Sequence, residues 1–181
     1  MRREWLLIIV CIITTAWGLW SVHNTLAQPA GDFTPPPGAT NPDVTQDTIG
    51  TTVCQPGYTH TIRPPVEYTD NLKYTQMRER NYSDTNPADY EEDHWVALAI
   101  GGNPVNATNL WPEPYNDWGP AGRAREKDRL EYAMYRALCA HAVTLAEAQG
   151  CFLNQPRWDV CLNDPKIADR IKPFLSTRMG E

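Results

Sequence analysis

The sequence has little of what a zinc-binding or generally nucleic-acid-binding protein needs. Its 181 residues include five cysteines and four histidines, and no two cysteines have the Cys-x-x-Cys spacing. Structural zinc sites use closely spaced cysteine or histidine ligands, so a zinc-finger fold is disfavoured. The formal net charge of −6 argues against a surface that binds nucleic acid everywhere. A local basic groove remains open, built from Lys73, Arg78 and Arg80 or from Arg123, Arg125, Lys127 and Arg129.

Long hydrophobic runs are absent as well, since none reaches the roughly 20 residues of a transmembrane helix. The longest, residues 5–20, follows Arg2 and Arg3 and precedes a polar stretch that ends at Ala27. A basic start, an apolar middle and a small residue at the end are typical of a secretory signal peptide, which we assign to residues 1–27. The alternative is an uncleaved anchor in which residues 5–20 contact the membrane. Both interpretations predict an exported protein, secreted or held in the periplasm or cell envelope.

Export would place the cysteines in an oxidising compartment, where they form disulfides. Cys11 lies in the apolar run, which leaves four in the rest of the chain: Cys54, Cys139, Cys151 and Cys161. An even number in an oxidising compartment predicts two disulfides. Four cysteines allow three pairings, and the sequence does not choose among them. Cys151–Cys161 would be a local bridge, and it would leave Cys54–Cys139 to join the start of the domain to its central helix.

The chain divides into three parts. After the signal peptide, residues 28–50 are rich in Pro, Thr, Asp and Gly, which predicts a disordered or polyproline-like linker. Residues 51–175 are then expected to form a single domain, and they contain no internal repeat.

The domain is predicted to be α+β. Alternating residues over 94–100 predict a strand, and residues 109–112 are expected to return beside it as a hairpin. Residues 57–65 are expected to be extended. Helices are predicted at 70–80, at 123–141 with one apolar stripe, from the Thr144–Glu147 capping box, and from Pro165.

The candidate catalytic and metal-binding side chains lie in the stretch EEDH, residues 91–94, where the predicted strand begins. A carboxylate that holds a hard divalent cation, beside a histidine that acts as a base, is a workable arrangement for phosphodiester hydrolysis. The plainer alternative is that Asp93 is a charge at a strand end and that His94 is a structural histidine bonded within the hairpin.

The sequence pattern around these residues comprises Glu91-x-Asp93-His94, Gly101-Gly102 and Asn109-Leu110. This pattern resembles the HNH endonuclease family, whose core of two strands and one helix surrounds a cation (ββα-metal). A wider pattern resembles small exported bacterial HNH-like proteins over about residues 51–150, through Cys54-x-Pro56-Gly57-Tyr58, Arg63-Pro64, Asn109-Leu110-Trp111-Pro112-Glu113, Lys127-Asp128-x-x-Glu131 and Ala148-Gln149.

The resemblance implies a small ββα-metal core within a mainly helical, disulfide-bonded domain. It implies that His94 is the general base, that Asp93 binds the metal, and that Asn109 braces the loop and the base. It also implies a divalent cation, magnesium or manganese, and a nucleic-acid substrate, for which DNA is favoured and RNA is the alternative.

The chain departs from the HNH pattern on the helix after the hairpin. Many HNH proteins supply a further metal ligand there, but no histidine lies between His94 and His141. On a helical wheel, Lys127 and Glu131 border the apolar face and Asp128 points away. We therefore expect Glu131 to be the second metal ligand and Lys127 to contact a phosphate. The alternatives are a plain Lys127–Glu131 salt bridge and a catalytically inactive binding module, secreted or membrane-anchored, on the same fold.

Overall fold

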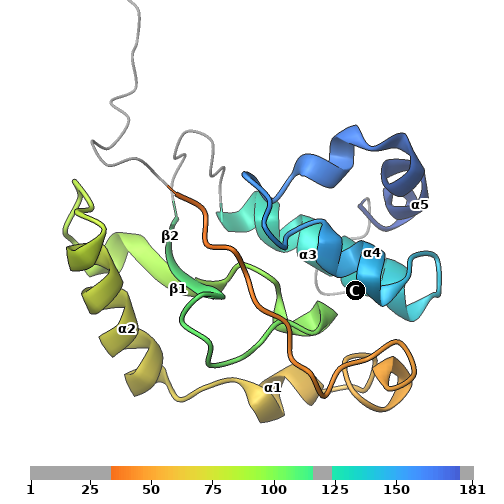
Figure 1. Ribbon diagram of the computed structural model, residues 1–181, viewed down its shortest axis with the longest axis horizontal. Helices are drawn as coiled ribbons and strands as arrows, with labels where there is room; N and C mark the ends of the chain where they lie inside the picture. Colours follow the sequence, from red (N-terminus) through yellow and green to blue (C-terminus); the bar gives the residue numbers. More distant parts are fainter. Residues whose placement is uncertain (1–33, 116–123, 176–181) are drawn as a thin grey trace, which may run out of the picture.

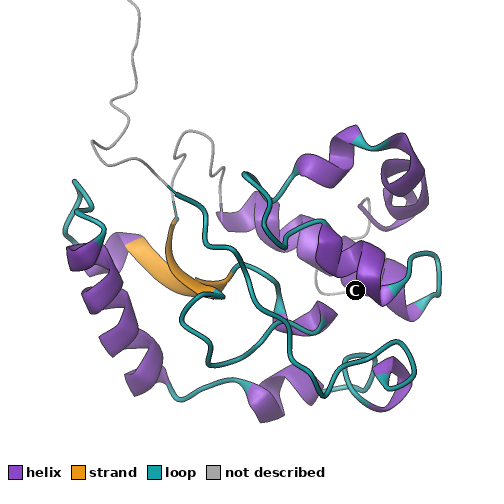
Figure 2. Cartoon of the chain, in the orientation of Figure 1, coloured by secondary structure: helices purple, strands orange, loops and turns teal. Residues whose placement is uncertain are grey.

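A computed structural model of the chain describes residues 34–115 and 124–175 (Figure 1). The assigned signal peptide and residues 28–33 of the predicted linker lie outside the described residues. Within the described ranges the protein is mixed α+β, with several helices and a small antiparallel sheet of two strands (Figure 2). None of the helices in these ranges is both long enough and apolar enough to cross a bilayer.

The sheet is a hairpin of β1 (Tyr90–His94) and β2 (Leu110–Pro114). Its register places Glu91 opposite Glu113 and Asp93 opposite Trp111. Because side chains alternate along a strand, these carboxylates share one face of the hairpin. The helix α2 (Val66–Glu79) lies on one side of the hairpin, and α3 (Ala124–Cys139) lies on the other (Figure 1).

The predicted hairpin is present, but its first strand was placed wrongly. The acidic stretch itself is β1, and the strand ends at His94, where it was expected to begin. Residues 98–100 form a short 3-10 helix (Leu98–Ile100). The side chain of Asn109 binds both the N–H and the carbonyl of Val96, which ends the ladder one residue after Trp95. Residues 95–100 are apolar because this loop is buried on all sides. Sequence periodicity alone does not distinguish a short buried loop of this kind from a buried strand.

The Gly-Gly pair after this turn is required by close packing. Gly101 adopts φ +81°, and a side chain there would also meet Val44 Cγ1 at 2.8 Å. A Cβ on Gly102 would lie 1.7 Å from the carbonyl oxygen of Val96. Only glycine lets the chain fold back this closely on itself and on the N-terminal segment.

The segment 34–50 was predicted to be a linker, and this prediction is wrong for the part that the structure describes. Val44 and Ile49 are buried in the core. Thr40 forms a β-bridge to Gly102, and Gln46 accepts a hydrogen bond of 2.7 Å from the N–H of Leu145. Its prolines suit an extended chain, but backbone pairing and two apolar anchors hold that chain across the domain (Figure 1, orange).

The helix predictions were mostly correct. The short helices are α1 (Tyr58–Ile62), η1 (Ile49–Thr51), η2 (Pro87–Asp89) and η5 (Val160–Asn163), and α1 replaces the extended segment expected at 57–65. The predicted capping box opens α4 (Leu145–Gly150): the Thr144 side chain accepts from the N–H of Glu147, and the N–H of Thr144 donates back to the Glu147 carboxylate. Pro165 begins α5 (Pro165–Leu175), as predicted.

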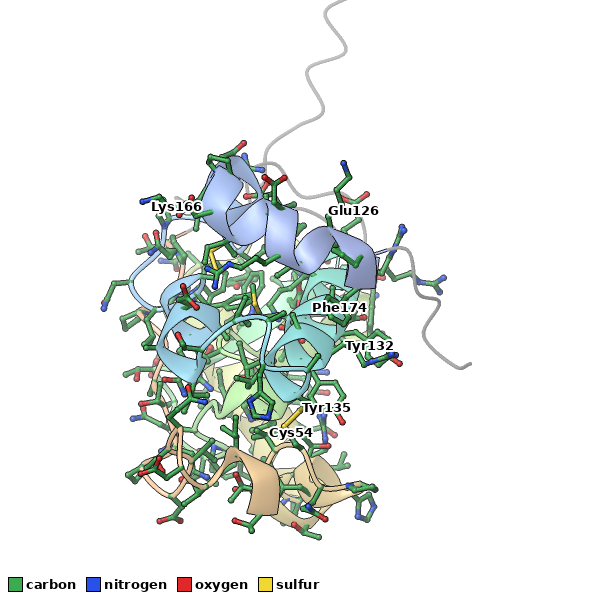
Figure 3. All side chains as sticks on the ribbon, turned by 90° about the vertical axis from the view of Figure 1, so that its right-hand side faces the viewer. Cys54, Glu126, Tyr132, Tyr135, Lys166 and Phe174 are labelled. Atoms are coloured by element: carbon green, nitrogen blue, oxygen red, sulfur yellow. A yellow bond between two sulfur atoms is a disulfide. The ribbon has the colours of Figure 1, made fainter. Side chains whose placement is uncertain are left out.

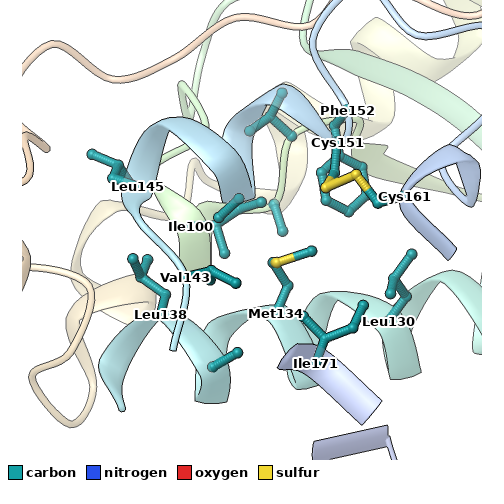
Figure 4. Packing of buried hydrophobic residues seen from close by; sticks show 14 of the residues in the cluster. Ile100, Leu130, Met134, Leu138, Val143, Leu145, Cys151, Phe152, Cys161 and Ile171 are labelled. Carbon is teal, nitrogen blue, oxygen red and sulfur yellow. A yellow bond between two sulfur atoms is a disulfide. The ribbon is translucent and has the colours of Figure 1, made fainter. Parts of the chain in front are cut away.

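The core lies between α3, the 98–100 turn, α4 and α5. Leu130, Met134 and Leu138 point from α3 into it (Figure 4). They meet Ile100, Val143, Phe152 and Ile171. The predicted apolar stripe is thus confirmed except at His141, which lies beyond the helix end, exposed and at φ +57°.

Both expected disulfides are present. Cys151 bonds to Cys161 inside the core (Figure 4), and Cys54 bonds to Cys139 at the end of α3 (Figure 3). The second bridge spans 85 residues and joins the N-terminal part of the domain to the central helix. Two disulfides are compatible with an extracellular location.

Candidate functional site

A lysine occupies the centre of the predicted site. The ammonium of Lys127 forms ion pairs with Asp93 from β1 and with Glu131 one turn further along α3. It also donates to the carbonyl of His94 at 3.0 Å, and it lies 3.7 Å from Oε2 of Glu113 on β2. The lysine side chain is 0% exposed. The three ammonium hydrogens go to Asp93, Glu131 and the carbonyl of His94, so the structure lends no support to the predicted phosphate contact of Lys127.

Glu113 carries a proton in this cluster. Its side chain is 1% exposed, and no described group donates a hydrogen bond to either of its oxygens. A bare carboxylate there would be costly, and burial followed by the nearby Asp93 charge raises the pKa of Glu113 to about 10. The neutral acid can share its proton with Asp93. Lys127 and this proton donor together lower the pKa of Asp93 to about 2 against the opposing effect of burial, so Asp93 keeps the charge.

The two helix carboxylates differ from their expected roles. Glu131, the predicted metal ligand, is 14% exposed and turns back onto Lys127. Burial raises its pKa to about 8. Asp128, which the wheel placed away from the site, is half-buried, and its pKa is raised by burial and then by Asp93. On β1, burial and Asp93 raise the pKa of Glu91 to about 7. Asp128 and Glu91 therefore flank Asp93 at the outer rim.

His94 is fixed at the end of β1. Its ring is 2% exposed, and Nε2 lies 3.0 Å from the carbonyl oxygen of Pro104. A carbonyl only accepts, so Nε2 carries the proton and Nδ1 is left as the acceptor nitrogen of the neutral ring. Burial, the largest influence, lowers the pKa of His94. The ring is thus held neutral and in one tautomer.

Asn109 braces this loop. It is 0% exposed, and its Oδ1 accepts from the N–H of Val96 at 2.9 Å and from that of Ala39 at 3.2 Å. Its Nδ2 donates to the carbonyls of Val96 at 3.1 Å and Asn103 at 2.9 Å. All four hydrogen-bonding positions of the amide are used. The side chain positions the loop that carries Pro104, the partner of His94, and does not face a reacting group.

The cluster makes stability depend on pH in a defined direction. Burial raises the pKa of Glu113 from 4.5 to about 10, and those of Glu92 and Glu131 to about 8. Between these values and 4.5 the folded state holds more protons than the unfolded chain, so its stability falls as pH rises. Asp93, with its pKa lowered to about 2, contributes stability that is lost as pH falls below 3.8. We expect the melting temperature to be highest between about pH 4 and 5 and to fall towards pH 9.

Circular dichroism melts from pH 3 to 9 check this expectation, with Glu113→Gln as the matched variant. The neutral amide cannot ionise, so the decline above pH 5 should be shallower in the variant. A melting temperature that climbs steadily from pH 5 to 8 in the unmodified protein would contradict the proton assignment.

The residues fit an open metal site completed by water and phosphate, and they do not fit a closed cage of protein ligands. No three His, Cys, Asp or Glu side chains within 34–115 and 124–175 are grouped as a metal cage. Asp93 and Glu131 both pair with Lys127, so the ammonium takes the place between them where a cation was expected. Magnesium, however, often uses one or two carboxylates together with water and substrate phosphate. Asp93 is 20% exposed and, with Glu91 or Asp128 beside it, fits such an open site.

Sequence reasoning found most of this cluster and missed one essential member. Asp93, Lys127 and Glu131 were predicted to lie together, and they do. Glu113 was seen only as part of a motif and was given no role. Its signal was its position in a strand of apolar residues, since a glutamate between Pro112 and Pro114 on a fully buried strand needs a partner.

No protein-family model, curated protein or solved structure compared with the chain matches it.

Proposed function

We propose that this chain is an exported, HNH-type endonuclease that hydrolyses phosphodiester bonds in nucleic acid, with DNA the favoured substrate and RNA the alternative. The observation that carries the proposal is the state of His94: a neutral imidazole, held by Pro104 in one tautomer, that follows an ionised aspartate directly in the chain. A general base needs this combination of fixed geometry and low pKa. In this proposal β1, β2 and α3 are the two strands and the helix of a ββα-metal core.

Each residue then has a distinct task. His94 takes a proton from water at Nδ1 while Nε2 stays bonded to Pro104. Asp93 would hold a divalent cation, magnesium or manganese, and the cation would neutralise charge on the phosphate. Lys127 and the proton on Glu113 keep Asp93 ionised and oriented. Asn109 positions the loop. Lys127 and Asn109 thus act through other residues and do not touch the substrate.

Metal binding by Asp93 can be tested apart from cleavage. Titration calorimetry of the full chain with Mn²⁺ should show binding that Asp93→Asn weakens at least about tenfold, because a main ligand is lost. Asp128→Asn should weaken binding less. Glu131→Gln should have the smallest effect of the three, because Glu131 already binds Lys127.

The exposed Asp169 on α5 supplies the control, and Asp169→Asn should bind Mn²⁺ as the unmodified protein does. Loss of binding in Glu131→Gln as large as in Asp93→Asn would move the metal to the site between them and contradict the open arrangement.

A second candidate function is a non-catalytic binding module on the same fold, secreted or membrane-anchored. The observation that favours it is Lys127, which neutralises the predicted metal ligands from within. Plasmid cleavage assays with Mg²⁺ and Mn²⁺, together with the titration above, separate the two. If the unmodified protein neither binds a divalent cation nor nicks any nucleic acid, the module is correct and the nuclease is not.

A further inference from the structure

A pocket lies at the C-terminal end of α2, away from the carboxylate cluster. Its volume is about 350 Å³, and six residues line it: Tyr74, Met77, Arg78, Asn81, Tyr82 and Thr85. These residues come from the last turns of α2 and from the turn that leads to β1 (Figure 1). The residues assigned to catalysis and metal binding do not line it.

Two tyrosines give the pocket aromatic walls. Tyr82 is fixed: its hydroxyl donates to the carbonyl of Pro112 at 3.1 Å, and its ring meets that of Tyr90 edge to face at 5.2 Å. Tyr74 is 58% exposed, and Met77 is buried beneath. A flat ring that enters this space would find one rigid aromatic wall, one adjustable wall and an apolar floor. Such a site suits a base that stacks.

The pocket is also cationic in a chain whose net charge is negative. Arg78 lines it, and Arg80 interacts electrostatically with Tyr82, another lining residue. Within residues 34–115 and 124–175, neither arginine forms an ion pair with a carboxylate.

We propose that this pocket binds a nucleotide of a single-stranded nucleic acid, with the base between Tyr74 and Tyr82 and a phosphate on Arg78. Asn81 and Thr85 supply polar groups at the rim for the base edge. Rings alone would also suit a peptide side chain, but a guanidinium next to two stacking surfaces matches the alternation of phosphate and base in a nucleic acid. The inference rests on the proposed nuclease function and assigns it a substrate form.

The position of the pocket fits a subsite next to the catalytic residues. Tyr82 packs on Tyr90, which is three residues from Asp93 on β1. At about 3.3 Å per strand residue, this separation along β1 is about 10 Å. A single strand can extend further per nucleotide than the about 3.4 Å of a duplex strand, so it covers such a distance within a few nucleotides. The pocket would therefore hold a base a few nucleotides from the bond that is cut.

Fluorescence anisotropy with a labelled single-stranded oligonucleotide tests the pocket without cleavage if the full chain carries His94→Ala. In that background, Tyr74→Ala should weaken binding about tenfold through loss of stacking. Arg78→Ala should weaken it several-fold and reduce the slope of log K against log salt by about 0.7, the share of one phosphate contact. Both side chains are exposed, so the melting temperature should stay the same and unfolding would not explain the loss.

Two controls separate stacking from general charge. Tyr68→Ala and Lys166→Ala remove an exposed tyrosine of α2 and an exposed lysine of α5 outside the pocket, and both should bind as the parent does. An abasic strand of the same length offers phosphates without bases. The effect of Tyr74→Ala should vanish on this strand, whereas the effect of Arg78→Ala should remain.

The proposal is overturned if no oligonucleotide binds, if the controls lose as much affinity as the pocket variants, or if only a peptide competes for the site. Its failure is distinct from failure of the nuclease. If Tyr74→Ala and Arg78→Ala bind and cut like the unmodified protein while His94→Ala does not cut, the pocket is wrong and the nuclease stands. If oligonucleotide binding depends on the pocket but neither the unmodified protein nor any variant cuts, the nucleotide-binding proposal is correct and the nuclease proposal is wrong.

Discussion

Replacing Lys127 with methionine should lower the free energy of unfolding by about 3–5 kcal/mol, the typical cost of removing one partner from a buried ion pair. Lys127 is 0% exposed and is the only cation within 4 Å of Asp93, Glu113 and Glu131 among the described residues. Methionine keeps much of the side-chain volume, so the loss is electrostatic. Without the ammonium, the Asp93 charge is left in a site that burial has made unfavourable.

The deficit should depend on the neighbouring acids. Adding Asp93→Asn to Lys127→Met should recover part of the lost stability, because the uncompensated charge is removed with its partner. The deficit should also shrink as pH falls towards 4, where more of the carboxyl groups are neutral. Chemical denaturation at pH 7 and pH 4.5 measures both effects.

Lys73→Met is the matched control for this experiment. Lys73 donates to the carbonyl of Tyr90 at 3.1 Å, and its partner Asp70, at 3.7 Å, is half exposed. We expect Lys73→Met to cost at most about 1 kcal/mol, as for exposed pairs. A cost for Lys127→Met as small as that of Lys73→Met would contradict the assignment of Lys127 as the cation of a buried cluster.

Replacing His94 with alanine should reduce the rate of phosphodiester cleavage by about 10²–10⁴-fold, the usual contribution of a positioned general base. The imidazole is neutral at pH 7 because burial lowers its pKa, and its Nε2–H is bonded to Pro104. The rate of the unmodified protein should therefore rise with pH and level off above a pKa below the ordinary histidine value. Initial rates of plasmid nicking in Mg²⁺ or Mn²⁺ from pH 4.5 to 8.5 give both results.

His141→Ala removes an exposed histidine at the end of α3 and should leave the cleavage rate unchanged. Because His94 is buried, the variant's melting curve must show a folded protein before its rate is interpreted. A folded His94→Ala protein that cuts at the unmodified rate would exclude His94 as the base, and the nuclease proposal would lose its main support.

The alternation of apolar residues over 94–100 led to the wrong strand because burial, rather than pairing, produced the pattern. The backbone pairing of residues 95 and 96 depends on Asn109, whose side chain takes the place of a strand partner. A contact between residues 13 positions apart is not encoded in local periodicity. For the same reason the proline-rich segment 34–50 was not expected in the core, although Val44 and Ile49 anchor it there.

The helical wheel of α3 had a similar limit. It placed Lys127 and Glu131 at the border of the buried face, and the structure brings both to Asp93. The wheel gives the direction of a side chain but not the identity of its partner. Whether Glu131 faces a metal or the lysine one turn away depends on how closely α3 approaches the hairpin, and this distance is a property of the packed molecule.

The sequence by itself determined the α+β class, a hairpin followed by a helix, the presence of two disulfides, and three of the residues that meet at the site, Asp93, Lys127 and Glu131. These features follow from local rules: capping, apolar stripes, turn glycines and an even number of cysteines outside the N-terminal apolar run. Tertiary structure alone decided the cysteine pairing, the path of residues 34–50 and the ionisation of the carboxylates. The physical reason is that desolvation and Coulomb interactions depend on distances in space, and so only folding made Lys127 a buried counter-ion and Glu113 a neutral acid.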